Sequence, residues 1–365
     1  MVTAIYLASM SSMVYLVRSQ ISLPFSGNRV TGIAFDGQPL DLYLDSGLIG
    51  THVIYKDWYE KTYGICPPKT CYTCINECHP YSEEQLMINF DDGSAITTVY
   101  HYGVIELAGH KLEMKFRLIV GWSPSPTIPT EKPMNYLGIA YRMDRYDETV
   151  MIQLFLKNLI SDKTVSVCAP SDLKNFTGVV ILGSLREEQC PTAFPKIVLR
   201  MKSSGFFNTA LLSLALVSSK GRPFMQRVPD GMVIYDTGAY SVFLPKPYFE
   251  FVLNKITEIV KQDSGLDVHV VTKGSAWFIE ERGYEYFPTL AFALGDRTSH
   301  TTIYIPPSQY TENCGGTWCH LVLRHYNLPY ITLGRPFFTT YFSSFREIRE
   351  GRRTVTLAPY AKSEG

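Results

Sequence analysis

Two short segments each carry an aspartate out of an apolar run and directly into a tight turn. Residues 42–50 read LYLDSGLIG, and residues 233–241 read VIYDTGAYS. In both, a small hydroxyl residue and a glycine follow the acid. A single tripeptide of this kind is an ordinary turn sequence. Two copies, each led by three apolar residues, indicate a functional pair formed by Asp45 and Asp236.

Two carboxyl groups within hydrogen-bonding distance have a specific chemistry. They cannot both ionise cheaply, so they share one proton and titrate in two steps. The ionised member can take a proton from a water molecule, while the protonated member gives one to a carbonyl oxygen under attack. We therefore predict that Asp45 and Asp236 hydrolyse an amide bond without a covalent intermediate, a metal or a cofactor. The residues predicted to hold the two carboxyl groups rigidly are Ser46, Gly47, Thr237 and Gly238.

The two segments belong to a longer internal repeat. Each aspartate is followed, at a similar distance along the chain, by an apolar pair and a glycine. These are Gly138 in YLGIA and Gly334 in TLGRP. The chain therefore resembles two copies of one unit, and two related lobes that face each other would bring one aspartate from each into a shared cleft.

The elements that must position these residues are predicted to be mainly strands. Short apolar runs alternate with clusters of Gly, Pro, Asn and Asp, which is typical of many short strands. Helical periodicity is convincing mainly in residues 151–161 and 246–262. The 34 basic and 34 acidic side chains cancel, which argues against nucleic acid as a partner. No apolar run reaches the length of about 18 residues that a membrane span requires.

The amino terminus allows two interpretations. Residues 1–17, MVTAIYLASMSSMVYLV, are apolar enough for a secretory signal, but they lack a basic residue, and the first cation is Arg18. Alternatively, MVYLVRSQISL is the first strand of the domain.

The eight cysteines indicate the cellular compartment. Four crowd one loop, where an iron–sulfur cluster or a four-thiolate zinc site is also conceivable. The even count, the local pairs and the Pro- and Asn-rich loop favour disulfides and an oxidising compartment. We predict a bond between Cys314 and Cys319, one between Cys168 and Cys190, and two local bonds of undetermined pairing among Cys66, Cys71, Cys74 and Cys78. The sequon at Asn175 is a glycosylation candidate that agrees with a secretory route.

With these motifs in place, the chain resembles the pepsin-like aspartic proteases over most of its length. The segments that carry the resemblance occur in the family's order: GIAFDGQPLDLYLDSG, NFDDGS, MNYLGIAY, GVVILGS, FPTLAFAL, YIPPSQY, ITLGRPFFTTYFSSFR and VTLAPY. The resemblance implies an all-β, bilobal fold with a cleft between two lobes. Residues 1–187 would form the N-terminal lobe with the first catalytic aspartate and the flap, and residues 188–365 the C-terminal lobe with the second. The substrate-binding and flap residues that it implies are Phe90, Gly93, Ser94 and Ala239.

Three positions depart from the family pattern. The family usually has a serine after the first Asp-Thr-Gly, where its hydroxyl bonds the catalytic carboxylate, and this chain has Leu48. The flap tyrosine and its tryptophan partner align with Phe90 and His52. Both partners of one hydrogen bond are therefore replaced. This costs less stability than replacing one partner, because no buried polar group is left unpaired.

The sequence is compatible with two alternative functions. The first is a secreted or lumenal aspartic endopeptidase, acting as a monomer without a cofactor on extended peptides with bulky apolar residues. The second is a non-catalytic protein that uses the cleft as a peptide- or protein-binding groove. Because both aspartates are intact, we favour the enzyme.

Overall fold

The computed structural model describes residues 20–75, 78–140, 149–184, 190, 192, 196–202, 205–296, 298–349 and 351–361. Most of the described residues lie in strands, as the sequence predicts. The two interpretations of the amino terminus concern residues 1–19, which lie outside the described residues. The segment that begins at Gln20 is the strand β1.

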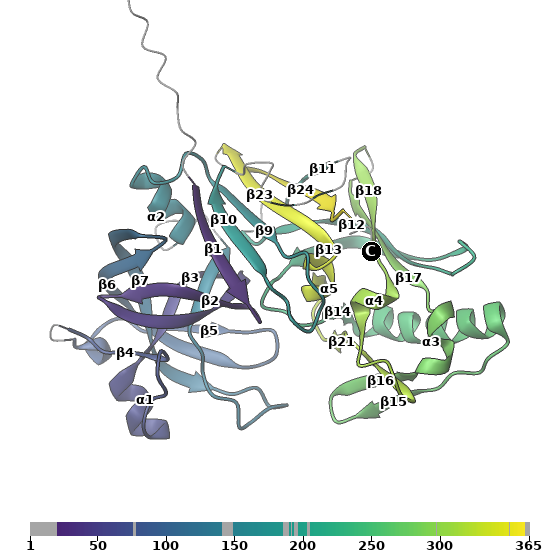
Figure 1. Ribbon diagram of the computed structural model, residues 1–365, viewed down its shortest axis with the longest axis horizontal. Helices are drawn as coiled ribbons and strands as arrows, with labels where there is room; N and C mark the ends of the chain where they lie inside the picture. Colours follow the sequence, from purple (N-terminus) through teal and green to yellow (C-terminus); the bar gives the residue numbers. More distant parts are fainter. Residues whose placement is uncertain are drawn as a thin grey trace, which may run out of the picture.

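The largest sheet contains the first aspartate and most strands of the first half of the chain. Its order is β11-β24-β23-β9-β10-β1-β2-β3-β7-β6-β5, and β4 and β8 also pair with β3. Its strands from the first half are β1 (Gln20–Ser26), β2 (Arg29–Phe35), β3 (Gln38–Tyr55), β4 (Cys71–Tyr72), β5 (Leu86–Asn89), β6 (Ala95–Leu107), β7 (His110–Ser123), β8 (Tyr136–Ala140), β9 (Thr164–Cys168) and β10 (Gly178–Gly183). Those from the second half are β11 (Ile197–Arg200), β23 (Tyr341–Arg349) and β24 (Arg352–Pro359). In Figure 1, β23 and β24 lie between the purple and teal part of the molecule and the green part.

Two further sheets are built from the second half. The order of the larger is β18-β17-β12-β13-β22-β14-β21, and that of the smaller is β15-β16-β20-β19. The larger comprises β12 (Asn208–Val217), β13 (Pro223–Tyr235), β14 (Val242–Pro245), β17 (Thr289–Gly295), β18 (His300–Ile305), β21 (Leu323–Tyr326) and β22 (Ile331–Leu333). The smaller comprises β15 (Val270–Lys273), β16 (Ala276–Glu280), β19 (Thr311–Glu312) and β20 (Trp318–Leu321).

The helices are few and mostly short. They are α1 (Lys56–Tyr63), α2 (Val150–Leu156), α3 (Lys246–Ser264), α4 (Pro307–Tyr310) and α5 (Arg335–Phe338), with 3₁₀ turns at Pro80–Ser82 and Glu281–Tyr286. The helix predicted over 246–262 is α3, which ends where Gly265 adopts the left-handed conformation. The helix predicted over 151–161 is shorter and ends at Leu156, because Asn158 has a φ of 58° that a helix cannot continue. Among the described residues, no helix has both the length and the apolar character needed to cross a bilayer.

The repeat found in the sequence is also a structural repeat. β3 pairs in parallel with β8, and β13 pairs in parallel with β22. A Cβ added to Gly138 would lie 2.4 Å from the carbonyl oxygen of Gly50, and one added to Gly334 would lie 2.3 Å from that of Ala239. Each glycine therefore lies directly against the chain that leaves an aspartate turn, where no side chain fits.

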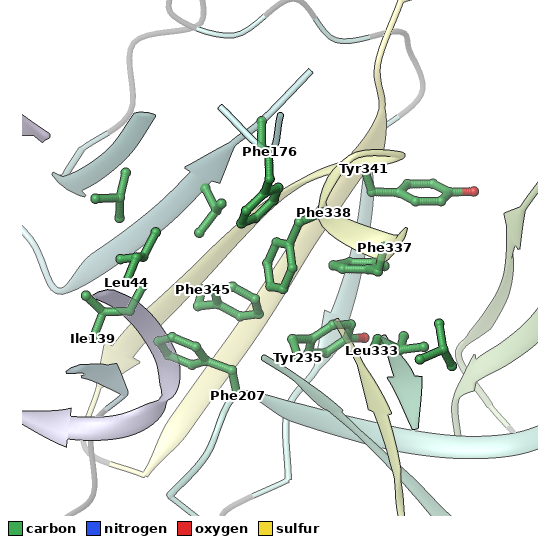
Figure 2. Packing of buried hydrophobic residues seen from close by; sticks show 14 of the residues in the cluster. Leu44, Ile139, Phe176, Phe207, Tyr235, Leu333, Phe337, Phe338, Tyr341 and Phe345 are labelled. Carbon is green, nitrogen blue, oxygen red and sulfur yellow. The ribbon is translucent and has the colours of Figure 1, made fainter. Parts of the chain in front are cut away.

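A shared core fixes the strands that precede the two aspartates. Leu44 and Tyr235, the residues immediately before Asp45 and Asp236, are both fully buried. Figure 2 shows them in one cluster with aromatic side chains from β23 and α5. In the same cluster the rings of Phe207 and Phe345 stack with centroids 4.1 Å apart. Because protein cores are close-packed, neither aspartate strand can shift without disturbing this cluster.

The cysteines lie at disulfide-bonding distance in four pairs. The pairs Cys314–Cys319 and Cys168–Cys190 agree with the prediction. The loop pairing that the sequence left open is Cys66–Cys71 and Cys74–Cys78. These four pairs are compatible with disulfide bonds within the chain.

Candidate active site

Asp45 and Asp236 line one cavity of about 470 Å³. Asp45 is buried within β3, and Asp236 is partly exposed directly after the last residue of β13. Aromatic side chains form much of the cavity wall, and they come from both halves of the chain. The two predicted catalytic residues are therefore brought together, as the sequence analysis expects.

The two turns hold each other through reciprocal hydrogen bonds. The Ser46 backbone N–H donates to the Thr237 hydroxyl at 3.0 Å, and the Thr237 backbone N–H donates to the Ser46 hydroxyl at 2.8 Å. Each hydroxyl then donates to the strand of the opposite turn. Ser46 Oγ bonds the carbonyl oxygen of Tyr235 at 3.0 Å, and Thr237 Oγ1 bonds that of Leu44 at 3.1 Å. Four buried hydrogen bonds thus lock the two turns into one unit.

The glycines bring the two carboxyl groups together. The N–H of Gly47 donates to Asp45 Oδ1 at 2.7 Å, and the N–H of Gly238 donates to Asp236 Oδ1 at 2.8 Å. A Cβ on Gly47 would lie 2.9 Å from Asp236 Oδ2, and a Cβ on Gly238 would lie 2.9 Å from Asp45 Cγ. Each carboxyl group therefore contacts the glycine of the other turn. The side chains of Asp45 and Asp236 also hydrogen bond to each other.

The surroundings raise the pKa of both carboxyl groups. Burial is the largest cause for Asp45, and the negative charge of Asp236 adds to it, so its pKa lies well above the usual range. Burial also raises the pKa of Asp236, to about 6, against the opposing hydrogen bond from Gly238 N–H. The hydrogen bond between the carboxyl groups favours the protonated form of Asp45 and the ionised form of Asp236. Because both pKa values are raised and the carboxyl groups are in contact, the pair is expected to titrate as one unit that holds a single shared proton between its two steps.

The segment that the sequence predicts as a flap is a hairpin that forms part of the cavity wall. β5 and β6 pair in register from Asn89 opposite Ala95, and the turn lies between them. Phe90 and Ser94 line the cavity, and so does Ala239 on the opposite turn. Gly93 does not belong to the lining; its φ of 84° shapes the turn instead.

The positions that depart from the family pattern have other neighbours. The ring of Phe90 packs against Tyr136 with centroids 5.4 Å apart. His52 is fully buried, and its Nε2 bonds the carbonyl oxygen of Ile49 at 2.9 Å. Leu48 is buried in an apolar cluster that Phe90 also contacts. The hairpin is therefore held at this point by apolar packing.

Sequence reasoning missed two residues that support the aspartate turns. Asn28 is fully buried, and its amide donates to the carbonyl oxygens of both Leu44 and Thr237, which bridges the two turns. The Tyr43 hydroxyl donates to the carbonyl oxygen of Gly238 at 3.1 Å. Tyr43 stands within the motif that drew attention to Asp45, whereas Asn28 follows a glycine in what reads as an ordinary turn.

Away from the cavity, the described residues contain one group of possible metal ligands. The ligand atoms of Cys74, Cys78 and His101 lie within 4.8 Å of one another. The two sulfur atoms are paired with each other, and we assign no metal to this group.

The glycosylation candidate lies on the surface. Asn175 is exposed, and its amide donates to Asp172 Oδ2 at 2.8 Å. The residue that follows it, Phe176, is fully buried. The acceptor side chain is therefore accessible but held by a local hydrogen bond.

Comparison of the chain with protein-family models and with curated proteins found no match in either case.

Proposed function

We propose that the protein is an aspartic endopeptidase. The observation that carries the proposal is the pair of hydrogen-bonded carboxyl groups of Asp45 and Asp236, both with raised pKa values, in the wall of one cavity. A pair that shares one proton has both a base and an acid at mildly acidic pH.

In the proposed reaction, each proton has a defined path. The ionised Asp236 takes a proton from a water molecule, whose oxygen attacks the peptide carbonyl carbon. Asp45 gives its proton to the carbonyl oxygen, so the intermediate is a neutral tetrahedral diol. As the C–N bond breaks, Asp236 gives its proton to the departing nitrogen, and Asp45 recovers a proton from one hydroxyl of the diol. The pair returns to its starting state with one shared proton.

The proposed substrate is an extended peptide with bulky apolar residues. The cavity wall includes the aromatic side chains of Tyr43, Phe90, Trp122 and Tyr136, which offer apolar surface to such residues. The hairpin over the cavity would exclude water from the bound peptide. The pepsin-like resemblance supports the same substrate class, with residues 1–187 and 188–365 as the two lobes on either side of the cleft.

A secreted or lumenal location is part of the proposal. The chain has four cysteine pairs at bonding distance. Disulfide bonds persist in oxidising compartments and are rare in the cytosol. The exposed side chain of Asn175, the acceptor of the sequon, agrees with that route.

The test is incubation of the protein with an unfolded protein substrate over a pH series from about 3 to about 7, across the range in which carboxyl pairs titrate. Cleavage should be strongest in mild acid, and a statine-type peptide should block it. The matched control is the same peptide with the configuration of its hydroxyl-bearing carbon inverted, which should inhibit far less. No cleavage at any pH, together with tight and equal binding of both peptides, would favour the binding-groove alternative.

A further inference from the structure

The charged side chains in the cavity wall all have the same sign. Within the described part of the chain, every charged side chain in the cavity wall is acidic, and no Lys, Arg or His lines it. These acids are Asp45, Asp91, Asp92, Glu131 and Asp236. The proposed catalytic pair accounts for two of them. The other three have no role in the proposed reaction, so they are candidates for selecting the ligand.

Of these three acids, Asp91 is the one that contacts the opposite wall of the cavity. It lies on the turn of the β5–β6 hairpin, and each of its carboxylate oxygens lies 3.3 Å from the hydroxyl of Tyr330, which belongs to the second half of the chain. These distances are longer than is usual for O–H···O hydrogen bonds, and one proton is shared between two acceptors. The carboxylate is thus oriented toward the far wall but held there only weakly.

The wall that Asp91 faces is aromatic. The ring of Tyr330 meets that of Tyr326 edge to face at 5.9 Å, and Tyr326 meets Phe243 edge to face at 5.5 Å. All three rings line the cavity. A carboxylate beside aromatic rings is the combination that recognises an organic cation, because the charge pairs with the acid and also interacts with the ring faces.

No cation within the described residues neutralises Asp91. The titratable groups that face it are Asp92, Tyr326, Tyr330 and Asp236. Burial raises the pKa of Asp91, against the opposing hydrogen bond from Tyr330, and the charge of Asp92 raises it further. Its own charge in turn raises the pKa of Asp236, which places Asp91 within electrostatic reach of the reacting carboxyl pair.

We propose that Asp91, Tyr326 and Tyr330 form a subsite for a lysine or arginine side chain of the bound peptide. Asp91 is an exposed residue of the cavity wall, and the cation would replace its weak Tyr330 contact. The inference rests on the proposed function for the location of the peptide, and it adds a basic residue to the apolar preference. Because Asp91 acts on Asp236, the basic residue lies near the bond that is cleaved.

The subsite has a defined pH dependence. Since the pKa of Asp91 is raised, its carboxylate is lost at a higher pH than that of an ordinary aspartate. The preference for a basic residue should therefore be strongest toward neutral pH and fade as the pH falls and Asp91 becomes protonated. Added salt should weaken it as well, because the group is partly open to solvent.

The experiment uses a neutral apolar peptide in which a single lysine is moved through successive positions. Each lysine peptide is paired with one that carries norleucine, which has a similar length and no charge. At one position near the cleaved bond, kcat/KM should be about tenfold higher for lysine, the size expected for a partly desolvated ion pair with a ring contact. Asp91→Asn should abolish this ratio. The control Glu84→Gln removes the same charge from an exposed residue just before the hairpin and should leave the ratio unchanged.

A binding measurement separates this inference from the proposed function. In Asp45→Asn, which should not cleave, the dissociation constants of the lysine and norleucine peptides should differ in the same direction, and the added Asp91→Asn change should remove the difference. A lysine preference in binding without cleavage by the unmodified protein would support the subsite and refute the peptidase. Cleavage without a lysine preference at any position would overturn the subsite, as would a preference that Glu131→Gln removes and Asp91→Asn does not.

Discussion

The substitution Thr237→Val tests whether the reciprocal hydrogen bonds hold the two aspartate turns together. Valine has the shape of threonine, so the change removes the hydroxyl with little effect on packing. The Ser46 N–H then loses its acceptor, and the Leu44 carbonyl oxygen loses a donor. The carbonyl keeps the amide of Asn28 at 2.9 Å, whereas no replacement for the Ser46 N–H is evident in this buried turn.

The cost can be estimated from these bonds. A buried donor left without a partner costs about 1–3 kcal/mol, and the loss of the second bond adds about 1 kcal/mol or less. We expect Thr237→Val to lower the free energy of unfolding by about 1–4 kcal/mol in urea denaturation with the disulfides intact. Peptidase activity should fall through kcat more than through KM, because the carboxyl pair loses its fixed geometry.

The matched control is Thr272→Val, which makes the same change at an exposed position on the small sheet. It should change the unfolding free energy by less than about 0.5 kcal/mol. If Thr237→Val were no more destabilising than Thr272→Val, the hydroxyl would not lock the turns, and the reasoning would be refuted.

Three further predictions concern the pair and the cysteines. Because the pKa of Asp236 is raised to about 6, activity should rise with pH as this group ionises, so the acidic limb of the kcat/KM profile should have its midpoint near pH 6. Leu48→Ser should move this limb to lower pH, and an optimum near pH 2 would contradict the account. Gly47→Ala should abolish activity while the protein still folds, since the new Cβ would lie 2.9 Å from Asp236 Oδ2 and push the carboxyl groups apart; unchanged kcat/KM would show that they have room to move. Non-reducing peptide mapping should recover four local cysteine bridges, and eight free thiols by intact mass would argue against the oxidising compartment.

The features that the sequence predicted correctly are those encoded locally. The segments at Asp45 and Asp236 combine apolar runs with small residues, and that pattern is sufficient to locate them. The strand before Asp236 ends at Tyr235, as expected, whereas β3 continues through Asp45 to Tyr55 and only its pairing with β8 shifts register between Asp45 and Ile49. The matching glycines, Gly138 and Gly334, could be found because close backbone approach excludes every larger residue. The long helix at 246–262 has a clear apolar periodicity, and its face is buried.

The features that could not be predicted depend on contacts between distant segments. Asn28 reads as a turn residue, and only the fold places it between the two aspartate turns. Nothing in the sequence relates Asp91 to Tyr330, since the two come from different halves of the chain and meet across the cavity. The helix predicted over 151–161 ends early because its apolar pattern says nothing about the left-handed backbone at Asn158.

The central claim, that Asp45 and Asp236 act as one unit with a shared proton, is tested most directly by the kinetics of three variants. Peptide hydrolysis would be measured for Asp45→Asn, for Asp236→Asn and for the double variant. Asp230→Asn, an exposed change earlier on the strand that leads to Asp236, serves as the control. We expect each single variant to lose essentially all activity, the double variant to be no worse than either one, and the control to keep the unmodified rate. Substantial hydrolysis by either single variant, or losses that multiply in the double variant, would contradict the account.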